Sequence, residues 1–194
     1  NRRLPAQWRS FRPAWDIAVA VLRNRSIVGD PGHSVGLEVA VEPWQLLETL
    51  LERTLESVGR ATSGEIQSER KTTHGLLFQN GRMVQPVIPD GVLTSRGRVV
   101  ASFEAKYTNP MLIPAEAHIY QTLAAAGVLD APLAILIYPS DAPLQVYDVR
   151  ARGRQEMKLA TIGLDLFEYR RDGGADVRAA KLIEVIRSLS PLPA

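Results

Sequence analysis

The sequence predicts a mixed α/β fold in which a β-sheet is flanked by helices. Three observations predict it. The leucine-rich segment 44–59 has apolar residues at the i, i+3, i+4 spacing of an amphipathic helix. Segment 98–107 is rich in β-branched and aromatic residues, as strands are, and the continuous apolar run 134–138 is typical of a buried central strand. Because helical and strand segments alternate along the chain, we expect helices to pack on a sheet.

Apolar periodicity and turn residues place the individual elements. Gly59 and Gly127 are expected to end two helices, because glycine readily adopts the left-handed conformation that follows a helix. Residues 60–74 are polar and mixed, and are expected to form a loop with room for one short strand. The predicted order is helix 15–22, strand 35–41, a helix from Glu42 or Pro43 to 59, strand 83–93, turn 94–97, strand 98–107, helix 115–127, strand 134–138, strand 145–149 and helix 176–189.

The composition is that of a globular protein. Of the 194 residues, 45% are hydrophobic, which suffices for the core of one α/β domain. We therefore expect a single domain over residues 1–194, with a helix and lead-in over 1–40 and the core of the fold over 41–190. The first residue is Asn rather than Met, which leaves open that the sequence is a fragment of a longer chain.

Several classes of protein are excluded or disfavoured. The sequence has no cysteine, which excludes disulfides and thiolate zinc sites and is compatible with a reducing cytoplasm, where we expect the protein. The three histidines lack the spacing of zinc enzymes. No apolar run approaches the roughly 20 residues of a membrane-spanning helix, so no membrane association is expected. Arginines crowd the first 30 residues, and can contact a phosphate backbone or form an ordinary solvated surface.

Three charged residues around one predicted hairpin point to a chemical function. Glu104 and Lys106 are two residues apart on a strand, so their side chains lie on the same face. Asp90 comes 14 residues before Glu104, near the end of the partner strand. The predicted turn puts Asp90 near Ser102, one diagonal step from Glu104. We therefore expect both carboxylates and the ammonium group in one site.

Such a site fits phosphodiester hydrolysis. Two neighbouring carboxylates can share a hard cation such as Mg²⁺, for which Mn²⁺ is a substitute, because these ions prefer oxygen ligands. The cation can polarise a phosphate and lower the pKa of a bound water, while Lys106 stabilises the developing negative charge. The structural alternative is an ordinary solvent-facing Glu/Lys pair beside a turn-forming Pro-Asp.

The same residues resemble a known motif. Pro89-Asp90 followed by Glu104-Ala105-Lys106 looks like the PD-(D/E)xK nuclease motif with both halves present. The segment WQLLETLLERTL resembles the leading helix of McrC-type nuclease subunits of modification-dependent restriction systems, and EAKYTN is similar to that family's motif strand. With YQ at 120–121 and IYP at 137–139 in the same order, the resemblance spans roughly residues 14–165. It implies a restriction-endonuclease-like core, a mixed β-sheet flanked by helices.

The resemblance also implies further site residues. Glu48 matches an acid on the family's leading helix that ligates the metal directly or through water, and its alternative is a surface carboxylate. Gln121 matches a polar residue that orients a water or contacts the phosphate, and its alternative is a surface or capping amide. The implied catalytic set is Asp90, Glu104, Lys106, Glu48 and Gln121, and the implied metal ligands are Asp90, Glu104, Glu48 and the backbone carbonyl of Ala105.

We therefore expect a Mg²⁺-dependent endodeoxyribonuclease that acts on DNA in a McrBC-like restriction or defence system. McrC-type subunits dock onto a hexameric AAA+ GTPase, so the resemblance implies such a partner, although the family's usual N-terminal region is not evident in the sequence. Cleavage of both strands needs two sites, which a homodimer or a partner ring would supply. Two alternatives stay open: a repair, recombination or transposition nuclease of the same superfamily, and a non-catalytic DNA-binding or assembly module.

Overall fold

The structure, a computed structural model, describes residues 43–110, 113–150, 156–164 and 173–189. All of them belong to one compact unit, Pro43–Ala194. The predicted helix 15–22 and strand 35–41 lie outside the described residues, and the single domain over 1–194 stays a prediction. The elements are α2 (Pro43–Ala61), β1 (Gln67–Glu69), β2 (His74–Gln79), β3 (Arg82–Val87), β4 (Gly91–Ser95), β5 (Arg98–Ala105), α3 (Glu116–Val128), β6 (Leu133–Tyr138), β7 (Gln145–Val149), β8 (Met157–Gly163) and α4 (Gly174–Leu189).

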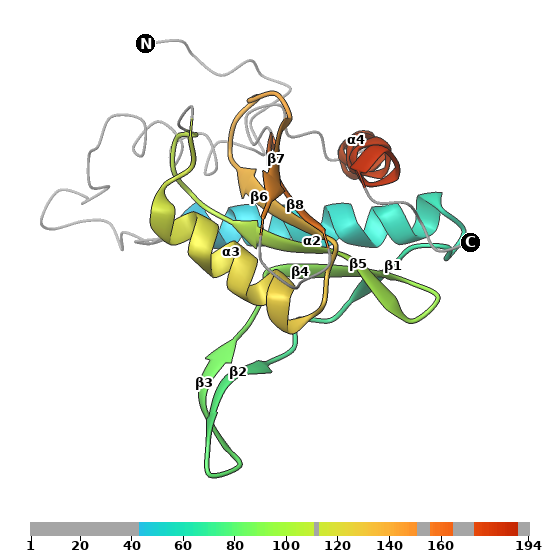
Figure 1. Cartoon of the computed structure of the whole chain (residues 1–194). Helices are drawn as coiled ribbons and strands as arrows, with labels where there is room; N and C mark the ends of the chain where they lie inside the picture. Colours follow the sequence, from blue (N-terminus) through green and yellow to red (C-terminus); the bar gives the residue numbers. More distant parts are fainter. Residues whose placement is uncertain (1–42, 111–112, 151–155, 165–172, 190–194) are drawn as a thin grey trace, which may run out of the picture. The chain divides into compact units, whose positions relative to one another are not determined.

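A six-stranded mixed sheet forms the centre of this unit, in the strand order β1-β4-β5-β6-β8-β7 (Figure 1). β5, β6 and β8 are parallel to one another, whereas β1, β4 and β7 pair with their neighbours in the antiparallel sense. β2 and β3 form a separate two-stranded sheet that projects from the six-stranded one (Figure 1). The predicted class, a mixed sheet flanked by helices, is confirmed.

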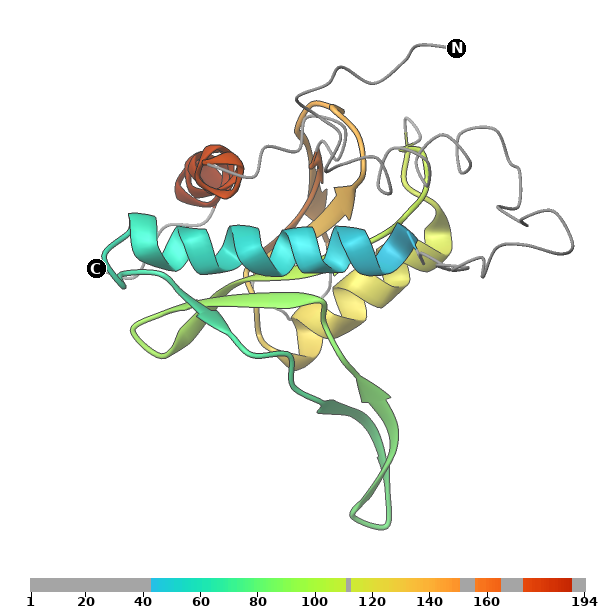
Figure 2. The same cartoon turned by 180° about the vertical axis from the view of Figure 1, so that it is seen from behind.

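The helices cover both faces of the six-stranded sheet (Figure 2). On one face the leucine stripe of α2 packs with α4 against β5, β6 and β8. Burial of each leucine side chain contributes about 2 kcal/mol to the free energy of unfolding. On the other face α3 packs in a smaller apolar cluster that includes Ala126 and Leu136. Leu46, near the start of α2, is 53% exposed, whereas the neighbouring Leu47 is buried.

The central elements have the expected lengths and environments. All six residues of β6 are buried, as the apolar run predicted, because this strand lies between β5 and β8. α2 ends at Ala61, two residues beyond the predicted end at Gly59. Just after this end, the Thr62 hydroxyl donates a hydrogen bond to the Val58 carbonyl of the last helical turn at 2.9 Å. None of the described helices is long and apolar enough to cross a membrane.

The predicted strand 83–93 was wrong, because the structure divides this segment between two sheets. Its first part belongs to β3 and its second part forms β4, and residues 88–90 connect them. β2 and β8 were not predicted. β2 has mostly exposed residues on both faces, so it lacks the alternation that marks a strand with one face on a core.

Candidate active site

Asp90 lies immediately before β4, beside the end of β5. Its backbone N–H donates to the Phe103 carbonyl at 3.0 Å. Its carboxylate oxygen Oδ2 accepts a hydrogen bond from the Ala105 N–H at 2.8 Å. The side chain is 10% exposed. These contacts hold the Asp90 carboxylate against the backbone between Glu104 and Lys106, the other two residues of the motif.

The register of the β4–β5 hairpin differs from the predicted one. A two-residue turn at Arg96-Gly97, with φ of 51° and 75°, joins the strands, and Gly91 pairs with Phe103. Left-handed conformations at both turn residues are typical of tight hairpins. Asp90 therefore lies beside Glu104 rather than near Ser102. In the observed register the carboxylates of Asp90 and Glu104 lie closer together than in the predicted one.

Glu104 is at the centre of a polar cluster built by β5 and α3. The residue is 3% exposed. Its oxygen Oε1 accepts hydrogen bonds from Lys106 Nζ at 2.7 Å and from Gln121 Nε2. Lys106 Nζ also donates to Gln121 Oε1 at 2.8 Å. The structure thus brings together three predicted site residues, whose side chains bind one another.

The second oxygen of this carboxylate has no partner in the described part of the chain. Glu104 Oε2 is buried and has no hydrogen-bond partner among the described residues. Burial and the nearby charge of Asp90 raise the pKa of Glu104, and the Lys106 ammonium offsets part of that effect. A buried carboxylate with a free oxygen is costly unless a proton or a cation reaches it.

Lys71 joins the site, although its sequence context gave no sign of it. It lies between β1 and β2, and its ammonium donates to Glu48 Oε2 at 2.8 Å and to Asp90 Oδ1 at 2.9 Å. Burial lowers the pKa of Lys71, but the bonds and charges of the two carboxylates outweigh it, so the net shift is upward. Lys71 therefore links Asp90 to Glu48, the residue that was predicted through the resemblance.

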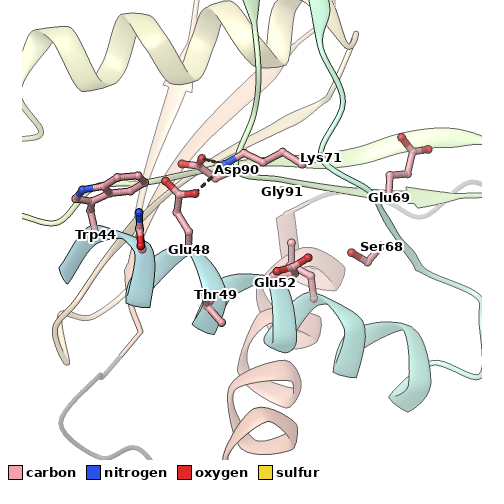
Figure 3. Close-up of a pocket in the computed structure, with 11 residues that line it drawn as sticks. Trp44, Glu48, Thr49, Glu52, Ser68, Glu69, Lys71, Asp90 and Gly91 are labelled. Atoms are coloured by element: carbon pink, nitrogen blue, oxygen red, sulfur yellow. Dashed lines mark hydrogen bonds and ion pairs between the residues drawn. The ribbon is translucent and has the colours of Figure 1, made fainter. Parts of the chain in front are cut away.

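A pocket of about 380 Å³ opens beside Asp90. It is lined by one side of α2, the end of β1 and the start of β4, as Figure 3 shows. Its lining is strongly acidic: Glu48, Glu52, Glu69 and Asp90 contribute carboxylates, and Lys71 contributes an ammonium group. The exposed Trp44 side chain lies at the same end of α2 as Glu48. The excess of carboxylates makes this pocket attractive to cations.

The donor set fits a hard cation in part. Carboxylate oxygens are the ligands that Mg²⁺ and Mn²⁺ prefer, and the unpaired Glu104 Oε2 is suited to accept one. However, no group of three or more His, Cys, Asp or Glu side chains is gathered closely enough to hold a metal within the part of the chain that the structure describes. The Lys71 ammonium binds both Glu48 and Asp90 instead.

His118 is a further polar residue of α3 near this cluster. Its ring atom Nδ1 is buried without a hydrogen-bond partner among the described residues, and its ring centroid lies 6.4 Å from that of Tyr138. Burial and the Lys106 charge lower the pKa of His118. The neutral ring therefore adds no positive charge beside Lys106 near neutral pH.

Comparisons with known proteins identify a fold relative. No protein-family model and no curated protein matches the sequence. Among solved structures, the chain is similar to one in the refined half-complex from the tetradecameric assembly of Thermococcus gammatolerans McrB AAA+ hexamers with bound McrC. The TM-score is 0.53 at 14% identity, and the match covers 94% of this chain and 40% of that chain. At this identity the likeness shows the fold, which is consistent with a restriction-endonuclease-like core.

Proposed function

We propose that this chain is a metal-dependent DNA endonuclease domain that hydrolyses phosphodiester bonds. The observation that carries the proposal is the cluster of Glu104, Lys106 and Gln121 beside Asp90, in which one buried oxygen of Glu104 has no partner among the described residues. A structural ion pair needs no such oxygen, because burying an unpaired carboxylate oxygen costs stability. A site that binds a cation does need it.

The side chains have distinct roles in this proposal. Asp90 and Glu104 would hold Mg²⁺ or Mn²⁺, with Glu48 and the carbonyl of Ala105 as further ligands. The bound ion would polarise the phosphate and lower the pKa of a water. Lys106 stabilises negative charge on the phosphate oxygens. Its position is fixed by hydrogen bonds to Glu104 and to Gln121.

The biological setting is proposed from the fold relative and from the motif. The solved neighbour is an assembly of McrB AAA+ hexamers with bound McrC. A McrBC-like restriction system with an AAA+ partner is therefore favoured over a repair, recombination or transposition nuclease. The unpaired Glu104 oxygen favours a working site over a non-catalytic assembly module. Cleavage of both DNA strands would need two such sites, from a homodimer or from a partner assembly.

Plasmid cleavage tests the proposed activity. Supercoiled DNA is incubated with the purified chain and Mn²⁺ or Mg²⁺, and nicked and linear products are measured. Glu104→Gln and Lys106→Met should each lower the rate by more than a hundredfold, because each removes a group that acts on the transition state. Glu184→Gln is the matched control, since Glu184 is an exposed carboxylate on α4 that does not line the pocket.

The proposal requires that cleavage depend on the metal and disappear in both site variants but not in the control. If the chain alone does not cleave, the assay is repeated with a McrB-type AAA+ protein and GTP. Equal cleavage by the wild type and by Glu104→Gln would contradict the assignment of the site.

A further inference from the structure

Lys71 has an unusual position for a residue in a polar connection. Its ammonium lies between the carboxylates of Glu48 on α2 and Asp90 at the start of β4, within 2.9 Å of an oxygen of each. Figure 3 shows both contacts at one end of the pocket. Elements far apart in sequence are thus joined through a single cation, in the way that a shared metal ion joins two carboxylates.

The surrounding charge explains why a cation belongs there. Among the described residues that line the pocket, four have carboxylates: Glu48, Glu52, Glu69 and Asp90. Lys71 is the one basic side chain among them. Without a cation, the charges of Glu48 and Asp90 would repel each other in a partly buried setting.

Glu104 provides an independent observation. This residue is 3% exposed, and one of its carboxylate oxygens has no partner among the described residues. Asp90 is hydrogen-bonded to the backbone on either side of it, at the Phe103 carbonyl and at the Ala105 N–H. Glu104 is therefore near Asp90 but receives no hydrogen bond from Lys71, whose two described bonds go to Glu48 and Asp90. Lys71 thus binds two carboxylates of the site, whereas the third, Glu104, is paired with Lys106 through Oε1 and keeps Oε2 without a partner among the described residues.

We propose that Lys71 is a tethered cation that holds Glu48 and Asp90 in place of a metal, and that a divalent ion must displace it in order to bind these carboxylates. The inference rests on the proposed function, because it concerns the same metal site. It also explains why no three carboxylates among the described residues are gathered closely enough to hold an ion: Lys71 occupies the space between two of them. Lys71 is thus a positioning residue that sets the affinity for metal.

A purely structural role predicts something different. The Lys71–Asp90 ion pair also closes the base of the segment that contains the β2–β3 hairpin. If closing that segment were its purpose, removal of Lys71 would loosen Asp90 and weaken or leave unchanged the binding of a metal. If Lys71 is a competitor, its removal strengthens metal binding.

The test is the affinity of the purified chain for Mn²⁺ by titration calorimetry, without DNA. Lys71→Met should bind Mn²⁺ roughly tenfold more tightly than the wild type, because two charge-assisted hydrogen bonds no longer have to be broken; tenfold corresponds to about 1.4 kcal/mol. Lys71→Arg keeps the cation and should bind with an affinity close to that of the wild type. Arg70→Met is the matched control, because it removes the same charge from the adjacent exposed residue.

Tighter binding by Lys71→Met but not by Arg70→Met supports the proposal. Weaker or unchanged binding by Lys71→Met overturns it, and so does an equal increase in Arg70→Met, which would reflect the general field of positive charge. In these cases the metal site and the proposed nuclease still stand. Absence of Mn²⁺ binding by the wild type and all variants overturns this inference and the proposed metal site together. Circular dichroism confirms that each variant is folded.

Discussion

Replacing Lys106 by methionine tests the central ion pair of the site. The Lys106 side chain is 19% exposed and the Glu104 side chain 4% exposed, and their charged atoms are 2.7 Å apart. Methionine keeps an unbranched apolar stem and removes the ammonium group. The substitution therefore leaves a buried Glu104 carboxylate whose remaining described donor is the Gln121 amide.

The expected cost follows from the burial of the pair. Removing one partner of a fully buried ion pair costs about 3–5 kcal/mol. Because Lys106 is partly exposed and Gln121 still donates to Glu104, we expect the free energy of unfolding to fall by about 2 kcal/mol. For a chain of this length, that corresponds to a fall in Tm of about 6 °C.

A double-mutant cycle separates the ion pair from simple loss of packing. Glu104→Gln removes the stranded charge, so the double variant with Lys106→Met should be more stable than Lys106→Met alone by about 1–2 kcal/mol. The free energies of unfolding are measured by urea denaturation with EDTA present. A Lys106→Met variant as stable as the wild type, or a double variant no more stable than Lys106→Met, would refute the reasoning.

Three further predictions concern the fold, the pH dependence and the metal. Gly163→Ala should destabilise the protein by about 3 kcal/mol in urea denaturation, because a Cβ there would come within 2.1 Å of the Ser140 carbonyl oxygen; an unchanged midpoint would contradict this packing. Because the pKa of Glu104 is raised in the folded state, the metal-free protein should lose stability as the pH rises from the usual glutamate range through that raised pKa. Urea midpoints across this range should show the loss in the wild type and not in Glu104→Gln, and parallel profiles would contradict it. Saturating Mn²⁺ should raise the Tm of the wild type, by the equivalent of about 2.7 kcal/mol at a hundred times Kd, and not that of Asp90→Ala; equal shifts in calorimetry would place the ion elsewhere.

The parts of the fold that were predicted are those with a strong local pattern. The leucine spacing of α2 and the apolar run of β6 reflect burial directly, so both elements were found. The β2–β3 hairpin was missed because its residues are mostly exposed on both faces. Tyr107, the last residue of the predicted strand 98–107, is 49% exposed, because β5 ends at Ala105 and the alternation of faces does not continue.

The residues of the candidate site differ in how far the sequence could predict them. Asp90, Glu104 and Lys106 were predicted together from their spacing around one hairpin, and the structure places them close together. Glu48 and Gln121 were inferred through a family resemblance, and both contact a lysine of the site. Lys71 carried no signal, since a single lysine in a polar connection has no periodicity or motif around it, and its role arises from tertiary proximity alone.

A crystal structure of the chain soaked with Mn²⁺, with anomalous scattering used to locate the ion, tests directly whether Glu104 and Asp90 hold a metal. We expect an anomalous peak in contact with Glu104 Oε2 and with the Asp90 carboxylate, and a Lys71 ammonium that has left Asp90. A structure with Mn²⁺ bound elsewhere on the protein, and with Glu104 Oε2 still unpaired, would contradict it.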